Sequence, residues 1–228
     1  MQVTTPLPPP QPVLLLPTLR ESTRDLHARI EGRLDITARL GSVSDYRTLL
    51  ERFYGFYSPL EEGLAAPERV SAWADLGILS EGRRKAGLLE SDLCALGLTA
   101  EDLDGVARCP MNLLPTPAST ADLIGCAYVV EGATLGGQVI GGLLERSLGL
   151  RPGDPGARFF HGYGSQTGAF WHQFRGAAEQ FAAREEAARP GSGAGVARQA
   201  VAASRRTFTD MEDWLMPEGV PIRGRQND

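Results

Sequence analysis

The chain has 228 residues, of which 42% are hydrophobic and 22% charged, with 23 basic and 28 acidic side chains and a formal net charge of -5. This composition excludes a disordered chain, and the acidic balance gives no general attraction to nucleic acid. Cys94, Cys109 and Cys126 form no CxxC pair, which argues against a disulfide framework or a thiolate metal site. We expect a soluble, cytoplasmic globular protein whose partners include neither nucleic acid nor a membrane.

The first 17 residues contain six prolines and no cation, so they lack the charged region of a signal peptide. We expect residues 1–17 to form a flexible, proline-rich arm, residues 18–217 the folded domain and residues 218–228 a C-terminal tail. Within the domain, apolar residues recur mostly every three or four positions, without alternating strand patterns. The predicted fold class is all-α, a single-domain helical bundle.

Seven helices are predicted, at 18–34, 43–65, 68–76, 80–96, 119–147, 166–188 and 194–216. Thr18 and Ser44 are the predicted N-caps of the first two. Loops are predicted where proline and glycine cluster, at 110–117, 149–156 and 189–193. Because no internal repeat is present, the helices indicate an irregular bundle around one buried space.

The first predicted helix carries two neighbouring stripes. The apolar stripe is Leu19, Leu26, Ile30 and Leu34, and the polar stripe beside it is Arg20, Arg24, His27 and Glu31. A neutral imidazole in this position can bind a metal through one nitrogen while the other donates to a carboxylate, and Glu31 lies one turn further on. From position alone, a partly buried histidine paired with Glu31 is the simpler interpretation, and both interpretations stay open.

The predicted helix at 119–147 has five glycines between positions 132 and 142, namely Gly132, Gly136, Gly137, Gly141 and Gly142. Each costs about 0.8–1 kcal/mol relative to alanine, or about 4–5 kcal/mol together. Close contact between helices would offset this cost, and so would a flat ligand lying on the backbone. Polar Asp122, Glu131 and Gln138 interrupt the apolar run and argue against a membrane span. The density of glycines favours a ligand surface.

Two segments in combination resemble the haem (heme) oxygenase family. Residues 19–27, LRESTRDLH, followed by Glu31, resemble its proximal helix, and residues 128–138, YVVEGATLGGQ, resemble its distal helix. The distal motif is most similar to the bacterial branch associated with bacteriophytochromes. Weaker similarity extends from about Thr18 to Leu215.

The resemblance implies a haem-oxygenase-like bundle that holds haem between these two helices. His27 would be the metal ligand, binding the haem iron, with Glu31 behind it. The catalytic surface over the other haem face would be formed by Gly132, Gly136, Gly137 and Thr134. Arg20 and Arg175, and less directly Arg24, would bind the haem propionates.

The activity that the resemblance implies is oxygen-dependent cleavage of haem to biliverdin, with release of iron and carbon monoxide. Haem would be both cofactor and substrate, and molecular oxygen the co-substrate. Because no segment resembles a flavin or iron–sulfur domain, electrons would come from an external donor, either ferredoxin-like or a reductase. A biliverdin-accepting bacteriophytochrome is a further implied partner.

The motif departs from the family at Ala133, where many members carry an aspartate that anchors distal waters. Glu131 cannot replace it, because two residues along a helix turn a side chain by about 200°. Thr134, backbone carbonyls or a side chain from another helix would then hold the waters. Two alternatives to the enzyme stay open: a haem-binding carrier or sensor on the same fold, and a helical interaction protein without haem.

The remaining histidines, His161 and His172, share no recurrent metal spacing, and glycines between them interrupt any common helix. We expect both to be structural or exposed. Cys126 is expected to be a small core residue rather than a nucleophile.

Overall fold

The computed structural model describes residues 14–78 and 81–217, and within these ranges every regular element is helical. The long helices are α1 (Leu15–Leu34), α3 (Val43–Leu64), α7 (Thr120–Leu148), α9 (Thr167–Ala188) and α10 (Ser192–Leu215). The shorter α-helices are α2 (Ile36–Arg39), α4 (Val70–Leu76), α5 (Ala86–Ala95), α6 (Ala100–Asp104) and α8 (Arg158–His161). Single 3-10 turns are η1 (Pro67–Arg69), η2 (Glu81–Arg83), η3 (Met111–Leu113) and η4 (Gly164–Gln166). The predicted all-α fold class is confirmed.

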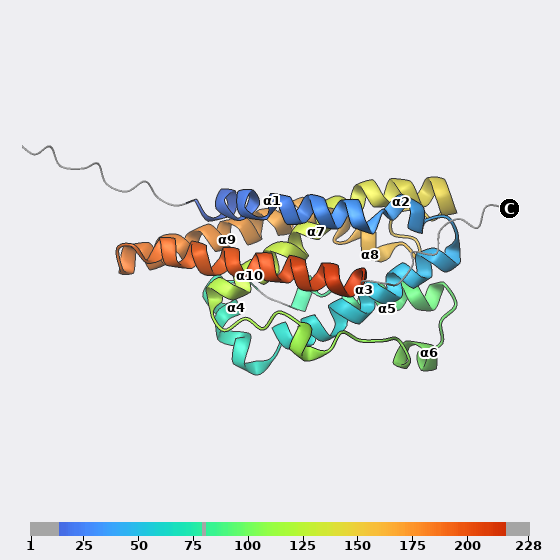
Figure 1. Cartoon of the computed structure of the whole chain (residues 1–228), viewed down its shortest axis with the longest axis horizontal. Helices are drawn as coiled ribbons and strands as arrows, with labels where there is room; N and C mark the ends of the chain where they lie inside the picture. Colours follow the sequence, from blue (N-terminus) through green and yellow to red (C-terminus); the bar gives the residue numbers. More distant parts are fainter. Residues whose placement is uncertain (1–13, 79–80, 218–228) are drawn as a thin grey trace, which may run out of the picture.

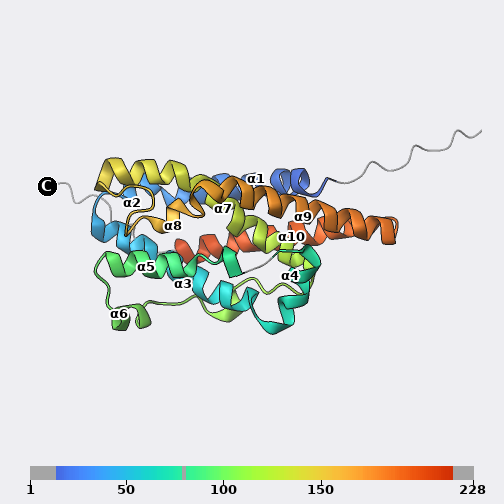
Figure 2. The same cartoon turned by 180° about the vertical axis from the view of Figure 1, so that it is seen from behind.

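Helix α10 lies at the centre of the bundle and packs against α1, α3, α7 and α9 (Figure 1). Seen from behind, α9 lies in front of α10 and beside α1 (Figure 2). Helices α3 and α5 pack together on the other side of α10. The arrangement therefore places α1 and α7, the two segments singled out from the sequence, against a common pair of helices, α9 and α10.

An aromatic cluster fixes α8, against which α7 packs. Phe53 and Tyr57 of α3 lie with their ring centroids 5.2 to 5.8 Å from those of Phe159 and Phe160. All four side chains are buried or half-buried. Large aromatic contacts of this kind dominate the energetics of a core, so α8 offers α7 a firm support.

Helix α1 begins at Leu15 rather than at the predicted Thr18. The side chain of Glu179 on α9 accepts hydrogen bonds from the amides of Leu15 and Leu16, at 2.9 and 2.8 Å, and both leucines are buried. Pro17 is tolerated in the first turn because an amide there has no partner within the helix. The predicted boundary of the arm is therefore wrong for residues 14–17. The remainder of the arm, residues 1–13, and the tail from 218 onward lie outside the described residues.

Further differences from the predicted helices include the N-cap of α3 and the segment before α5. The N-cap of α3 is Ser42, whose hydroxyl accepts an amide hydrogen bond at 3.1 Å, whereas the predicted Ser44 lies in the first turn. The predicted helix at 80–96 is divided into η2 and α5. At the break between η2 and α5, the carboxylate of Glu61 on α3 accepts hydrogen bonds from the backbone amides of Lys85 and Ala86. These bonds replace those that the amides would make inside a continuous helix.

Helix α7 is long and apolar enough to cross a membrane by length and composition alone. Half of its most apolar window is nevertheless buried inside the fold. Since buried helices of soluble proteins meet the same criterion, α7 is best described as a core helix with one open side.

Candidate functional site

His27 lies on α1 with a partly exposed imidazole that is held from two sides. Its Nδ1 lies 3.3 Å from Oε2 of Glu31, one turn further along the helix. The ring of Phe208 on α10 stands edge-on to the imidazole, with the centroids 6.0 Å apart. If Nδ1–H donates to the carboxylate, the lone pair of Nε2 points away from Glu31 and is available to a ligand.

One turn of α10 contacts both α1 and α7. Phe208 touches His27, and the neighbouring Thr207 lies with its hydroxyl 3.4 Å from the sulfur of Cys126 on α7. Burial raises the pKa of the Cys126 thiol to about 11, in agreement with the expected core role. A Cβ on Gly125 would lie 2.3 Å from a backbone oxygen of α10, so the two helices touch directly. His27 and the first half of α7 therefore flank the same turn of α10.

The open side of α7 carries a stripe that we call the open stripe, formed by Tyr128, Gly132, Leu135, Gly136 and Val139. Leu135 is 44% exposed and Val139 is 71% exposed. A Cβ on Gly136 would meet nothing within 4 Å, and one on Gly132 would meet only the ring of Trp171, at 3.9 Å. The stripe therefore presents apolar side chains and uncovered backbone, a surface that suits a flat apolar ligand.

Gly137 and Thr134 do not lie on the open stripe. A Cβ on Gly137 would lie 2.0 Å from the carbonyl oxygen of Phe160, so this glycine permits the close packing of α7 on α8. Thr134 donates to the carbonyl of Glu131 at 2.6 Å and lies against Gly162. The helical rotation of about 100° per residue turns both away from Gly132 and Gly136. Of the four residues expected to form one surface, Gly132 and Gly136 therefore lie on the open stripe, whereas Gly137 and Thr134 face neighbouring elements.

The predicted arginines are exposed, and the fold brings two of them toward one end of the site. Helices α1 and α9 run antiparallel (Figure 1), with Glu179 of α9 bound to the first turn of α1. Arg175 lies one turn before Glu179 on α9. Arg20 lies on α1, about one turn after the amides that Glu179 binds. Arg24, one turn beyond Arg20, forms an ion pair with Glu21.

One face of α9 extends from the open stripe to the start of α1. Trp171, Arg175 and Glu179 follow one another at intervals of four, so they share this face. Trp171 lies against Gly132 and 6.0 Å from the ring centroid of Tyr128, while Glu179 binds α1. Along α9, the exposed Arg175 therefore lies between the turn that contacts α7 and the turn that binds α1.

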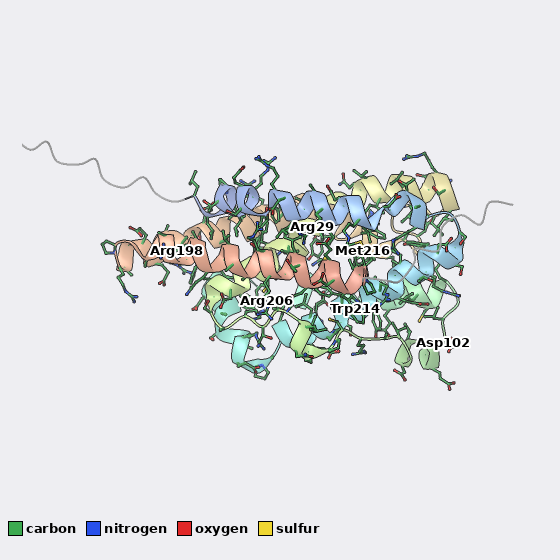
Figure 3. The ribbon with its side chains drawn as sticks, in the orientation of Figure 1. Arg29, Asp102, Arg198, Arg206, Trp214 and Met216 are labelled. Carbon is green, nitrogen blue, oxygen red and sulfur yellow. The ribbon has the colours of Figure 1, made fainter. Side chains whose placement is uncertain are left out.

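Three side chains of α1 join it to α10. Arg29 and Arg33 both bind the buried carboxylate of Glu212, the second at 2.7 Å, and Figure 3 shows Arg29 on the side of α1 that faces α10. Asp25 pairs with Arg205 at 2.8 Å. Burial acts to raise the pKa of Glu212, but hydrogen bonds from the two arginines outweigh it and hold the pKa below its usual range.

A buried charged cluster that no sequence pattern predicted lies behind α7. Glu131 is only 3% exposed and binds Arg83 and Lys85, whereas Ala133 is exposed. The two side chains point to different sides, as expected, so Glu131 does not occupy the place of the missing aspartate. An acidic residue inside an apolar run was the available signal, but nothing local showed which cations would meet it.

The residues of the site fit haem rather than a bare metal ion. In residues 14–78 and 81–217, no three His, Cys, Asp or Glu side chains gather to hold a metal. Haem supplies its own equatorial nitrogens and needs one protein ligand, an apolar surface and cations for its propionates. Two surface hollows of about 460 and 300 Å³ border α3 and include neither His27 nor the open stripe.

Comparison with known proteins adds independent evidence. A family model described as "Heme oxygenase" matches residues 14–210. A search of curated proteins found no match. Three solved structures share the fold at 19–20% identity.

Two of these structures are from a bacterium and an alga. Heme oxygenase from Leptospira interrogans is 20% identical, with a TM-score of 0.66, and the match covers 89% of this chain and 98% of that chain. Heme oxygenase 2 from Chlamydomonas reinhardtii without heme is 20% identical, with a TM-score of 0.67, and the match covers 92% and 99%.

The third structure is heme oxygenase-1 from the cyanobacterium Synechocystis in complex with heme, at 19% identity and a TM-score of 0.59, with 89% of this chain and 91% of that chain covered. At these identities the structures establish the fold, while the family model spans most of the chain. The chain therefore belongs to the haem oxygenase family and is an oxidoreductase that degrades haem.

Proposed function

We propose that the protein binds haem between His27 and the open stripe of α7 and cleaves it to biliverdin, iron and carbon monoxide, with dioxygen as co-substrate. When bound, haem supplies the redox-active iron and is itself the molecule oxidised. The observation that carries the proposal is an imidazole with an available Nε2 on α1, combined with the uncovered backbone of Gly136 on α7.

On the α1 side, His27 is the proposed axial ligand. Glu31 lies 3.3 Å from Nδ1, where its carboxylate can accept a hydrogen bond from Nδ1–H and leave Nε2 to bind the iron. The edge of Phe208 restricts rotation of the ring. Together they hold the donor atom in one orientation before haem binds.

On the α7 side, Gly132 and Gly136 keep side chains away from the haem. Exposed Leu135 and Val139 would become covered and would exclude water from the edges of the stripe. Ala133 has no polar atom to hold a water, and the Thr134 hydroxyl already donates within the helix. We propose that the carbonyls left uncovered along the two glycines hold the waters that deliver protons.

At one end of the site, Arg20 and Arg175 are the proposed partners of the propionates through charge-assisted hydrogen bonds. Arg24 is the weaker candidate because it is already paired with Glu21. The same exposed cations suit the acidic surface of an external electron donor, a ferredoxin-like protein or a reductase.

The resemblance of the distal motif supports two further proposals. The first is that a bacteriophytochrome accepts the biliverdin; the second, which the cation-free first 17 residues also support, is that the protein acts in the cytoplasm. The burial of half the apolar window of α7 supports a soluble protein.

A hemin titration followed by turnover tests the proposal. We expect wild-type protein to bind one hemin per chain and, with a reductant under oxygen, to convert it to biliverdin. His27→Ala should alter the ferric absorption spectrum and slow turnover by about 100-fold or more. His172→Ala, which changes an exposed histidine of α9, serves as the matched control.

Each outcome discriminates between the hypotheses. An unchanged spectrum in His27→Ala contradicts the proposed ligand. Haem absorption that persists under reducing, aerated conditions identifies a carrier or sensor instead of an enzyme. Failure of the wild-type protein to bind hemin contradicts both.

A further inference from the structure

A carboxylate at the centre of α7 is bound by three donors from two other parts of the chain. Oε2 of Glu131 lies 2.5 Å from Arg83, and Oε1 lies 2.9 Å from Nζ of Lys85 and 2.8 Å from the hydroxyl of Tyr163. Glu131, Arg83 and Lys85 are 3%, 5% and 2% exposed. The haem site described above uses none of these residues.

The cluster also binds α9. Arg83 donates to the side-chain oxygen of Gln173 at 2.8 Å and to the carbonyl of Phe170 at 3.3 Å. The ring of Tyr163 stacks on that of Phe170, with the centroids 4.4 Å apart. Burial, with Glu131 nearby, raises the pKa of Tyr163, so its hydroxyl stays protonated and donates to the carboxylate.

A buried charge cluster adds little net stability, because removing the charges from water costs nearly as much as their attraction returns. What such a cluster supplies is fixed geometry, since each donor accepts only a narrow range of positions. Glu131, the residue that the cluster anchors, comes directly before Gly132. From Gly132 onward, α7 has few side chains that could fix the position of the helix. Five interior glycines make this half of the helix easily deformed.

We infer that Glu131 is a positioning residue: through Arg83, Lys85 and Tyr163 it fixes the distance and rotation of the open stripe relative to bound haem, and so determines which meso carbon is oxidised. The inference rests on the proposed function. It assigns the cluster no contact with haem, because Glu131 faces away from the open stripe.

Glu131→Gln tests this role, since it keeps the size of the side chain but removes the charge that binds both cations. We expect hemin still to bind. Amide hydrogen exchange of the haem-free variant should accelerate about tenfold or more over residues 132–140, because the helix opens locally more often. Turnover should yield a mixture of biliverdin isomers in place of the wild-type distribution.

Tyr163→Phe is a milder variant that removes a single hydrogen bond, so it keeps the test valid if Glu131→Gln folds poorly. It should change exchange and isomer distribution in the same direction, by a smaller amount. The matched control is Glu212→Gln, because Glu212 is also a buried carboxylate bound by two cationic side chains, but it joins α1 to α10. The control should leave both readouts on α7 unchanged.

Wild-type exchange over 132–140 and wild-type isomers in both cluster variants would overturn the inference. So would an equal change in the Glu212→Gln control, since the effect would then report general destabilisation. If wild-type protein produces no biliverdin, the proposed function fails, and hydrogen exchange in the haem-free variants still decides whether Glu131 anchors α7.

Discussion

The two helices proposed to enclose haem are attached to the bundle by opposite means. Helix α1 is held by long side chains, with Arg29 and Arg33 on Glu212 and the carboxylate of Glu179 on its first turn. Helix α7, apart from the side-chain cluster around Glu131, is held by direct backbone contact, because Gly125 and Gly137 allow neighbouring carbonyls to approach closely.

Because of this difference, α1 can move slightly relative to the bundle while α7 is held more firmly in place. Arg29 and Arg33 are about half exposed, unlike Arg83 and Lys85, so they can change rotamers at low cost and α1 can shift slightly if its histidine takes up a ligand. Backbone contacts through glycine permit no such shift without a clash. Helix α7 is thus fixed at Gly125 and Gly137, and between them by the cluster around Glu131, while α1, which carries the proposed ligand, retains some freedom.

The largest expected effect comes from replacing a packed glycine of α7 by alanine. Gly137→Ala places a Cβ 2.0 Å from the carbonyl oxygen of Phe160. We expect it to lower the free energy of unfolding by about 3 kcal/mol or more. Urea unfolding of the haem-free protein measures this loss.

Its matched variant is Gly136→Ala, where the new Cβ meets nothing within 4 Å. Stability of the haem-free protein should rise by up to about 1 kcal/mol, since alanine favours a helix. Hemin affinity should fall, because the methyl group projects from the open stripe. Equal effects of the two substitutions on unfolding would remove the distinction between packed and open glycines.

An intermediate effect is expected from Glu212→Gln, which weakens the attachment of α1. Because Arg29 and Arg33 are about half exposed, we expect the free energy of unfolding to fall by only about 1–2 kcal/mol at pH 7. The pKa of Glu212 is depressed in the fold, so its contribution is present above the pKa of the unfolded chain and is lost as pH falls through the folded value. The difference between wild type and variant should therefore shrink below about pH 4.

Urea unfolding of both proteins at pH 7 and pH 3 gives the comparison. A stability difference that persists undiminished at pH 3 would show that the ion pairs do not hold α1. The comparison between side-chain attachment and backbone attachment would then need another basis.

The smallest effect is expected at the exposed arginines. Arg20→Ala and Arg175→Ala should each weaken hemin binding by about three- to tenfold, with the loss decreasing as salt is added. Arg24→Ala should have less effect, because this guanidinium is already paired with Glu21. Hemin titration at low and high ionic strength measures all three, and equal losses would show that their positions relative to the site do not matter.

The sequence predicted the long helices because their apolar residues follow the helical period. It also predicted the contact of His27 with Glu31, which depends only on positions one turn apart. The start of α1 was missed because the partner of its first amides, Glu179, lies 164 positions away. The density of glycines pointed to α7, yet it could not separate Gly136, which faces open space, from Gly137, which faces Phe160.

The anchoring of Glu131 was equally out of reach of local patterns. Lys85 lies 46 positions before it and Tyr163 lies 32 positions after it. Charged residues such as Arg83 and Lys85 are usually solvated, and only the tertiary fold shows that they are buried.

The contacts that hold α1 also determine when, during synthesis, this helix can pack into the fold. Its first amides bind residue 179, and Arg29 binds Glu212, which lies 183 positions later. Helix α1 leaves the ribosome before the other described helices, but an isolated helix of its length is only marginally stable in water. The segment that carries His27 therefore gains these partners only after α9 and α10 have emerged, so a product that ends before residue 179 would hold the proposed haem ligand on an unsupported helix.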